Sequence, residues 1–389
     1  MRMCAKCVLP ATYRNIRFDS EGVCNYCRTY ERLHDRLTDY DRLAVLRDER
    51  FDRVRGVGDY DCLVGLSGGK DSSWIALQLA QKHDLKCLGF TFDNGFLTDY
   101  AKDNIKLVVE KLGIDHFFWK IDQELHRRFY EQAVRHFGTP CPGCSYSSYA
   151  FSFKAAFERK IPLVVHGRSR SQMFRELLPG SVDAFVPFVK MNLMPYDNER
   201  NRAVVRSVVK KLEYFVTIAM RDPDMRRRFY DEFFPPPAEV AVADTLPEFM
   251  GYFLYQAYDE RVLMAELEDE LGWKRPENSG ILTHADCEVH DAAGYLFRQV
   301  FEYSMLCFEL SVMIREGDMT RDEALARLDA EPDVSDIPDE SLGCMCEKLA
   351  IDRAELPGIA KHLRYRNRWR NRYLRIKNFI KRPTLDLEE

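Results

Sequence analysis

The stretch that most constrains the fold is Ser-Gly-Gly-Lys-Asp-Ser at residues 67–72, which follows an apolar run and opens an amphipathic segment. The apolar run predicts a buried strand at residues 61–66, and the segment predicts a helix at residues 72–82. A strand, a glycine turn and a helix N-terminus form an anion site, because glycines allow close approach and free N–H groups favour negative charge. The stretch therefore predicts a phosphate site.

The side chains of this stretch suit phosphate, since Lys70 adds a cation and the serines add hydroxyl donors. The stretch is not a Walker A loop, because Val64 and Asp71 stand where that motif needs Gly and Ser or Thr. The alternative is an ordinary strand–helix turn with glycines chosen for packing. The predicted nucleotide ligands are Ser67, Gly68, Gly69, Lys70, Ser72 and Ser73.

Strand and helix patterns alternate over the next hundred residues, which predicts an α/β domain with a parallel sheet and helices on both faces. Ligands in such sheets bind beyond the carboxyl ends of the strands. Further strands are expected at residues 85–92, 115–121 and 161–166, and helices at residues 98–113, 122–137 and 145–159.

Two further strand ends belong to the same predicted site. Asp93 ends the second strand, where it would bind Mg²⁺ or a ribose, or simply form a turn. Gly167 and Arg168 follow the fourth strand, and Arg168 and Arg170 could hold phosphate or an acidic substrate. The alternative for the arginines is a solvated basic loop.

Four of the twelve cysteines form two Cys-x-x-Cys knuckles near the N-terminus. Cysteines at this spacing favour one tetrahedral ion, as in structural zinc ribbons, with an iron–sulfur cluster as the minority option. We therefore expect a closed structural Zn²⁺ site at Cys4, Cys7, Cys24 and Cys27.

A third pair, Cys141 and Cys144, lies just before the helix expected at residues 145–159. A helix N-terminus lowers thiol pKa values, so this pair is predicted to ligate a metal or act as a nucleophile. The best third ligand is Cys287, ahead of Cys344 and Cys346. Three thiolates suit a [4Fe–4S] cluster or an open zinc, and a structural zinc completed by His284 or His290 is the alternative.

The remaining chain is mostly helical, and a basic helix with interleaved aromatic residues is expected at residues 361–382. This composition is typical of a helix that binds RNA, a phosphorylated substrate or an acidic partner. It is equally compatible with a terminal helix that packs on the protein through Leu363, Trp369, Tyr373 and Ile376 and exposes its basic side chains. The expected units are a knuckle with four cysteines (1–30), a helical linker (31–60), the nucleotide domain (61–195), a partly helical insertion that completes the site (196–290) and a C-terminal helical region with a basic tail (291–389).

Overall charge and hydropathy exclude some classes of protein. The net charge of −5 over 389 residues argues against a protein that coats nucleic acid. No apolar stretch is long enough to span a membrane, and the N-terminus lacks a signal core. A cytoplasmic enzyme is expected.

The phosphate stretch resembles the PP-loop of the N-type ATP pyrophosphatases, which implies an adenine nucleotide alpha hydrolase-like fold. Several segments, taken in order, resemble the N-acetyl sugar amidotransferases of surface-polysaccharide biosynthesis. They are the two N-terminal knuckles, SGGKDS, PCPGCSYSSYAFSFKAAFERKIPLVVHGRS, FMGYFLYQAYDE, WKRPEN, HADC and IREGDMTRDEAL. The chain departs from that family at Arg168-Ser169, where Glu-Asn is usual, and at residues 9–13.

The resemblance implies a two-step reaction. ATP activates an acetamido oxygen of a small-molecule substrate, such as a nucleotide-linked N-acetyl sugar, with Mg²⁺ bound through Asp71 or Asp93. Ammonia then replaces the activated oxygen. No glutamine-hydrolysing nucleophile with a His partner is recognisable, so a separate glutaminase would supply the ammonia. Lys70 and Asp71 are the expected catalytic residues of the first step.

A second resemblance competes with the first. PP-loop enzymes that thiolate tRNA or small metabolites also pair SGGKDS with an internal Cys-x-x-Cys and a later lone Cys. In those enzymes the three cysteines hold an iron–sulfur cluster that carries sulfur. The resemblance implies the same role for Cys141, Cys144 and Cys287, with a sulfur-donor protein as partner. A non-catalytic nucleotide sensor or RNA-binding scaffold is the third alternative.

Overall fold

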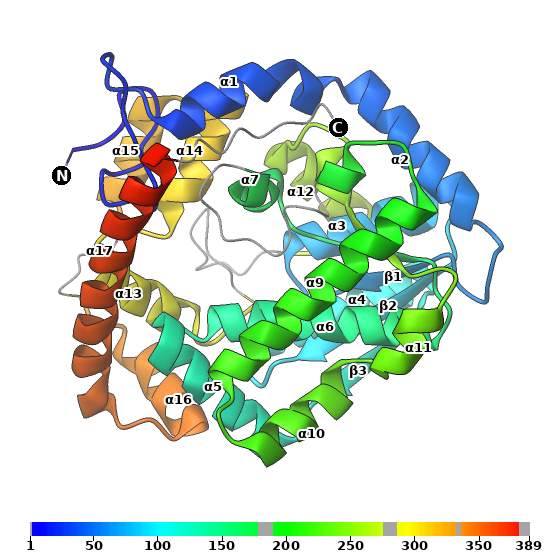
Figure 1. Ribbon diagram of the computed structural model, residues 1–389. Helices are drawn as coiled ribbons and strands as arrows, with labels where there is room; N and C mark the ends of the chain where they lie inside the picture. The colour runs from blue at the N-terminus through cyan, green and yellow to red at the C-terminus, as the bar shows by residue number, and fades with distance from the viewer. Residues whose placement is uncertain (1, 178–189, 275–285, 332–335, 381–389) are drawn as a thin grey trace.

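The computed structural model of the protein describes residues 2–177, 190–274, 286–331 and 336–380. A five-stranded sheet lies inside layers of helices, and the N-terminal segment lies beside the C-terminal helices α14 (Leu306–Glu316) and α15 (Arg321–Asp329) (Figure 1). The strands are β1 (Cys62–Gly65), β2 (Cys87–Asp93), β3 (Asp115–Lys120), β4 (Leu163–His166) and β5 (Glu248–Gly251).

The sheet is parallel throughout, in the order β3-β2-β1-β4-β5. Cys62 of β1 pairs with Cys87 on one side and with Leu163 on the other, so the central strands start in register. The four predicted strands are confirmed. Strand β5 falls outside them because a short buried apolar run has no periodicity that separates a strand from a buried helix.

Alternate residues of the strands face two hydrophobic cores, as a pleated strand requires. Val64 and Val165 pack with α2 (Tyr40–Val54), α3 (Lys70–Leu77), α4 (Asp99–Leu112) and α12 (Glu260–Leu271). Leu63 and Val164 pack with α5 (Gln123–Phe137), α6 (Cys141–Glu158), α9 (Asn198–Ala219) and α10 (Pro223–Phe233). Helices therefore cover both faces, as predicted.

The other helices surround this core. Helix α3 continues as a π-helix over Gln78–Lys82, and a capping box at Thr320 opens α15. No helix of the described residues is both long and apolar enough to cross a membrane. The remaining helices are α1 (Asn25–Thr38), α7 (Arg170–Leu177), α11 (Pro237–Val242), α13 (His290–Phe301), α14 (Leu306–Glu316), α15 (Arg321–Asp329), α16 (Asp339–Leu349) and α17 (Leu356–Ile380), with short 3₁₀ turns at Tyr252–Leu254 and Arg353–Glu355.

A buried ion pair fixes the edge strand β5 to α2. Arg50 Nε lies 2.8 Å from Glu248 Oε1, and both side chains are 0% exposed. Arg53 adds a second contact of 2.5 Å to the same carboxylate. The remaining guanidinium donors of Arg50 bond to backbone carbonyls, including Met194 O at 2.8 Å, so its charge is satisfied on all sides.

We expect Glu248→Gln to lower the free energy of unfolding by about 3–5 kcal/mol, because it leaves the buried charge of Arg50 without a counter-ion. Urea unfolding of the purified chain measures the loss. Glu110→Gln, on the exposed side of α4, is the matched control and should change stability by less than about 0.5 kcal/mol. Equal stability of the two variants would contradict the role given to the pair.

Candidate functional site

The predicted phosphate stretch lies between β1 and α3, at the carboxyl edge of the sheet. Gly69 is the N-cap of α3 and supplies no side-chain cap, so the first N–H groups of the helix are left for another acceptor. Ser72 Oγ accepts from Ser67 N at 3.1 Å and donates to Gly69 O at 3.1 Å. These bonds hold the loop in a shape that suits an anion at the helix N-terminus.

Gly68 is required by the packing of the loop against α4. Its φ is +79°, and a Cβ built there would lie 2.3 Å from Ala101 O. Asn104 Nδ2 donates to Gly68 O at 3.2 Å, which ties the loop to the same helix. Ser73, by contrast, is only 1% exposed and its hydroxyl has no hydrogen-bond partner, so it lies deeper than a surface phosphate ligand.

Lys70 and Asp71 form a partly exposed pair at the start of α3, with Nζ 3.1 Å from Oδ1. Tyr258 OH donates to the same Asp71 oxygen at 2.9 Å. Burial and the Asp71 carboxylate hold the pKa of Tyr258 far above its usual value, so its hydroxyl stays protonated and donating. Tyr258 was not among the predicted site residues, although it lies in the FMGYFLYQAYDE segment that carries the resemblance.

The loop after β4 lies directly on the phosphate loop, as predicted. A Cβ built on Gly167 would come within 3.1 Å of Ser72 Cα. Arg168 Nη2 donates to Ser145 Oγ at 2.5 Å, and its guanidinium lies 4.9 Å from the centre of the Tyr149 ring. Burial, and then the charge of Arg168, lower the pKa of His166 to about 3, so His166 is neutral at pH 7.

The phosphate role suggested for Arg170 is wrong. Arg170 is 2% exposed, and its Nε lies 2.8 Å from Glu316 Oε2 of α14. It also donates to the carbonyls of Leu37 and Leu254. Because these bonds surround the guanidinium with protein acceptors, Arg170 joins helices instead of facing a ligand.

Asp93 ends β2, as expected, and it closes a turn there. Its Oδ1 accepts from Gly95 N at 3.1 Å, and Lys120 Nζ lies 3.6 Å from Oδ2. This is the arrangement of a turn-forming aspartate. A nucleotide contact by Asp93 stays a prediction.

The structure brings the predicted cysteine trio to one neighbourhood beside this edge. Leu97, just after β2, forms an antiparallel bridge with Cys287, and Glu288 N donates to Phe96 O at 2.9 Å. Asn94 Nδ2 donates to Cys144 Sγ at 3.4 Å. Tyr130 is buried beside the trio, and its pKa is raised by burial and then by the nearby Cys144.

Two predictions about the trio need correction. Cys141 and Cys144 lie inside the first turn of α6, not before it, because Pro142 favours an early helix start. The lowered thiol pKa expected at a helix N-terminus is wrong for Cys144, whose pKa burial raises. Burial raises the pKa of Cys287 as well, so both are thiols at pH 7 in the chain alone.

The alternatives for the third ligand are placed differently. Cys344 lies on α16, where its Sγ contacts Glu288 Oε2 at 3.6 Å, and Cys346 packs against the core. His290 begins α13, and His284 lies outside the described residues. Three further cysteines, Cys62, Cys87 and Cys307, are all buried.

The N-terminal knuckles converge as predicted. The sulfur atoms of Cys4, Cys7, Cys24 and Cys27 all lie within 4.8 Å of one another, and among the described residues these four make the one such group. Cys7 and Cys24 Sγ are 3.8 Å apart. Four sulfurs about 2.3 Å from one zinc would be about 3.8 Å apart, so the group fits this ion. Arg315 of α14 donates to Cys27 Sγ at 3.4 Å and Cys7 Sγ at 3.5 Å.

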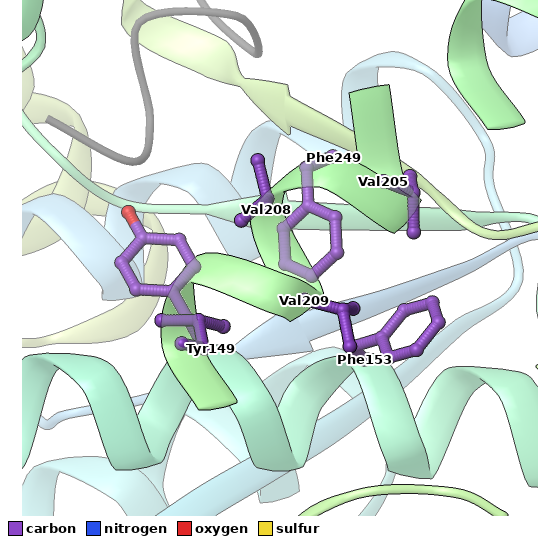
Figure 2. Close-up of a pocket in the computed structure, with 7 residues that line it drawn as sticks. Tyr149, Phe153, Val205, Val208, Val209 and Phe249 are labelled. Carbon is purple, nitrogen blue, oxygen red and sulfur yellow. The ribbon is translucent and has the colours of Figure 1, made fainter. Parts of the chain in front are cut away.

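A small apolar pocket lies between α6, α9 and β5. Figure 2 shows Tyr149 and Phe153 of α6 facing Val208, Val209 and Phe249. Its cavity volume is about 10 Å³, which is room for no more than one water molecule. The pocket is a packing gap and offers no room for a substrate.

The basic C-terminal helix α17 packs against α13 and α5, and part of its described surface is exposed. Leu363 of α17 is fully buried beside α13, whereas Trp369, suggested as a packing residue, is 55% exposed. Trp369 and the exposed Tyr365 form a T-shaped ring pair with centroids 6.2 Å apart. The side chains of Tyr373 and Ile376 lie outside the described residues. RNA binding by this helix stays a prediction.

Two protein families match parts of the chain. Residues 53–169 match the family described as Asparagine synthase, and residues 287–382 match "LPS biosynthesis protein WbpG-like, C-terminal domain". The first match contains the phosphate loop, and the second begins at Cys287 and contains α13 to α17. The two matches confirm the PP-loop and polysaccharide-biosynthesis resemblances seen in the sequence.

Other comparisons add little. No curated protein matches the chain. A solved structure, "U34-tRNA thiolase NcsA from Methanococcus maripaludis with its [4Fe-4S] cluster", is similar at 13% identity and a TM-score of 0.32, over 85% of this chain and 89% of that chain. A similarity at this level supports no inference about fold or function.

We expect Gly68→Ala to weaken ATP binding at least about tenfold, because the added Cβ collides with the backbone of Ala101 and forces the loop to move. Isothermal titration of ATP measures the change. Gly113→Ala is the matched control, since Gly113 also has a positive φ but has no atom within 4 Å of a built Cβ. Unchanged affinity in Gly68→Ala would contradict the role given to this loop.

Proposed function

We propose that the protein uses ATP to activate a carbonyl or acetamido oxygen of a small-molecule substrate, which ammonia then replaces. The observation that carries the proposal is the phosphate loop at the N-terminus of α3, in a chain whose C-terminal part matches an LPS biosynthesis domain. The substrate class that suits both is a nucleotide-linked N-acetyl sugar. A separate glutaminase supplies the ammonia.

The first step is adenylation. The phosphates of MgATP lie over the loop, where Gly68, Gly69 and Ser72 contribute donors and Lys70 contributes a charge. The substrate oxygen attacks the α-phosphorus, the bond to the bridging oxygen breaks, and pyrophosphate leaves. Asp71 and Tyr258 hold the Lys70 ammonium in place.

The second step is displacement. The nitrogen lone pair of ammonia attacks the activated carbon, and AMP departs with the original oxygen and the bonding electron pair. The nitrogen then loses a proton and becomes the new amidine nitrogen. The step needs no oxidant or reductant, and AMP is a far better leaving group than the unactivated oxygen.

A sulfur-transfer reaction is the second candidate, and the position of the cysteine trio favours it. Cys141, Cys144 and Cys287 share one neighbourhood, but they do not form a group within 4.8 Å like the knuckle cysteines do. Two ligands of one zinc can be no more than about 4.6 Å apart, so the trio as placed suits a [4Fe–4S] cluster better than a single zinc. When bound, such a cluster would offer one open iron to sulfide.

We expect Lys70→Ala to slow AMP formation at least about 100-fold, because it removes the cation that stabilises charge on the phosphates. AMP and pyrophosphate are measured with a panel of nucleotide-linked N-acetyl sugars and ammonium chloride. The control is Lys106→Ala, an exposed lysine of α4. Wild-type AMP release by Lys70→Ala would overturn the adenylation step.

Metal analysis separates the two candidates. After anaerobic purification we expect about one zinc per chain, lost in Cys24→Ser and kept in Cys287→Ser, because within the described ranges only the knuckle cysteines lie within 4.8 Å of one another. Under the proposed function the protein is colourless and free of iron. The opposite result is a protein that contains iron and sulfide and absorbs visible light, with all three signals lost in Cys141→Ser and Cys287→Ser but kept in Cys307→Ser. That result would indicate that sulfide, not ammonia, is the nucleophile.

A further inference from the structure

Helix α14 presents one face to the N-terminal knuckle. Phe308, Ser311 and Arg315 are spaced three and four residues apart, so they lie on the same side of the helix. Ser311 Oγ accepts from Val8 N at 3.3 Å, and the Phe308 ring stacks on Tyr13 with centroids 6.0 Å apart. Arg315, at the end of this face, lies beside the knuckle sulfurs. A helix from the C-terminal part of the chain therefore covers one side of the expected metal site.

The knuckle sulfurs receive their hydrogen bonds from two different sources. The backbone donates to the first cysteine of each pair, since Cys24 N lies 3.2 Å from Cys4 Sγ and Cys27 N lies 3.4 Å from Cys24 Sγ. Arg315 donates to the second cysteine of each pair, with Nη2 3.5 Å from Cys7 Sγ and Nε 3.4 Å from Cys27 Sγ. The guanidinium thus bonds the two sulfurs that these backbone bonds do not reach.

The charge of the site explains why an arginine suits this position. Cysteine binds a metal as thiolate, so one Zn²⁺ with four thiolates has an excess of negative charge. Arg315 is 7% exposed, and its guanidinium cannot lose its own charge. Among the described residues it forms no ion pair with a carboxylate, and the neighbouring Glu316 accepts from Arg170 and Tyr30 instead. The metal-bound sulfurs are therefore the negative charge that this buried cation contacts.

We propose that Arg315 belongs to the metal site without being a ligand, because its two sulfur contacts stabilise the metal-bound knuckle and couple metal binding to the packing of α14. Such coupling is reciprocal. If the packed helix strengthens metal binding, the bound metal strengthens the packing of the helix by the same free energy. The knuckle metal then helps to hold the C-terminal helices in place, a role beyond the folding of the first 30 residues. Nothing in this coupling depends on the proposed use of ATP.

The first test is the zinc affinity of the full chain, measured by competition with a chromogenic chelator. We expect Arg315→Gln to weaken zinc binding about 10- to 100-fold, because the loss of a group that bonds metal ligands typically has an effect of this size. Arg227→Gln, at an exposed arginine of α10, should keep the wild-type affinity. An unchanged affinity in Arg315→Gln overturns the proposal, as does a wild-type chain that binds no zinc.

A spectroscopic test separates the sulfur contacts from general packing. Cobalt(II) in place of zinc gives a sulfur-to-metal charge-transfer absorption. Positive charge and N–H donors lower the energy of the sulfur lone pairs, so this band should move to longer wavelength in Arg315→Gln. In Ser311→Ala the band should stay in place, because Ser311 packs on the knuckle from the same helix but contacts the Val8 backbone. An unmoved band in Arg315→Gln, or an equal shift in Ser311→Ala, overturns the proposal.

A second variant keeps the test decisive if Arg315→Gln is poorly folded. Arg315→Lys retains the positive charge but lacks the planar fork that reaches two sulfurs at once, so we expect zinc binding to weaken by about three- to tenfold. No loss of affinity in the lysine variant would overturn the role given to the paired contacts.

Reciprocal coupling also predicts an effect of the metal on the helix. Amide hydrogen exchange of α14 is measured with zinc bound and after chelation. Exchange should be faster in the zinc-free wild type, and zinc should slow it less in Arg315→Gln. Helix α10, which lies away from the knuckle, is the internal reference (Figure 1). If zinc leaves the exchange of α14 unchanged in the wild type, the coupling does not exist.

Discussion

Two neighbouring residues of α14 join the three regions of the molecule. Arg315 donates to the sulfurs of Cys7 and Cys27 in the N-terminal knuckle. Glu316 accepts from Arg170 at the start of α7 and from Tyr30 of α1. Both charges are buried, so each depends on its partners to offset the cost of leaving water. The C-terminal helices are therefore part of the structural support of the nucleotide domain and the knuckle.

The candidate site depends on close backbone contacts between segments that are far apart in the sequence. Gly68 fits against α4 with no space for a side chain, and Gly167 fits tightly against Ser72. The bridge between Leu97 and Cys287 then brings the C-terminal half of the chain to the same edge. A parallel sheet places its strand ends together, and these contacts turn that edge into one continuous site.

Local patterns predicted the loop, four strands and the knuckle, because their information lies within a few residues. Tyr258 was beyond such prediction, since it meets Asp71 across 187 residues of sequence. Arg170 could not be told from Arg168 without knowing that Glu316 lies beside it. The prediction of a lowered thiol pKa for Cys144 was wrong for a related reason. A helix N-terminus can be predicted from neighbouring residues, whereas burial depends on the whole fold.

The contact between Cys7 and Arg315 has a consequence for synthesis. The two residues are 308 positions apart, so at ordinary elongation rates Cys7 leaves the ribosome roughly 15–60 s before its arginine partner. Throughout that interval the four knuckle sulfurs must be held together without the C-terminal helices. A metal taken up early would serve that purpose, and the buried arginine would then close over a knuckle that had already formed.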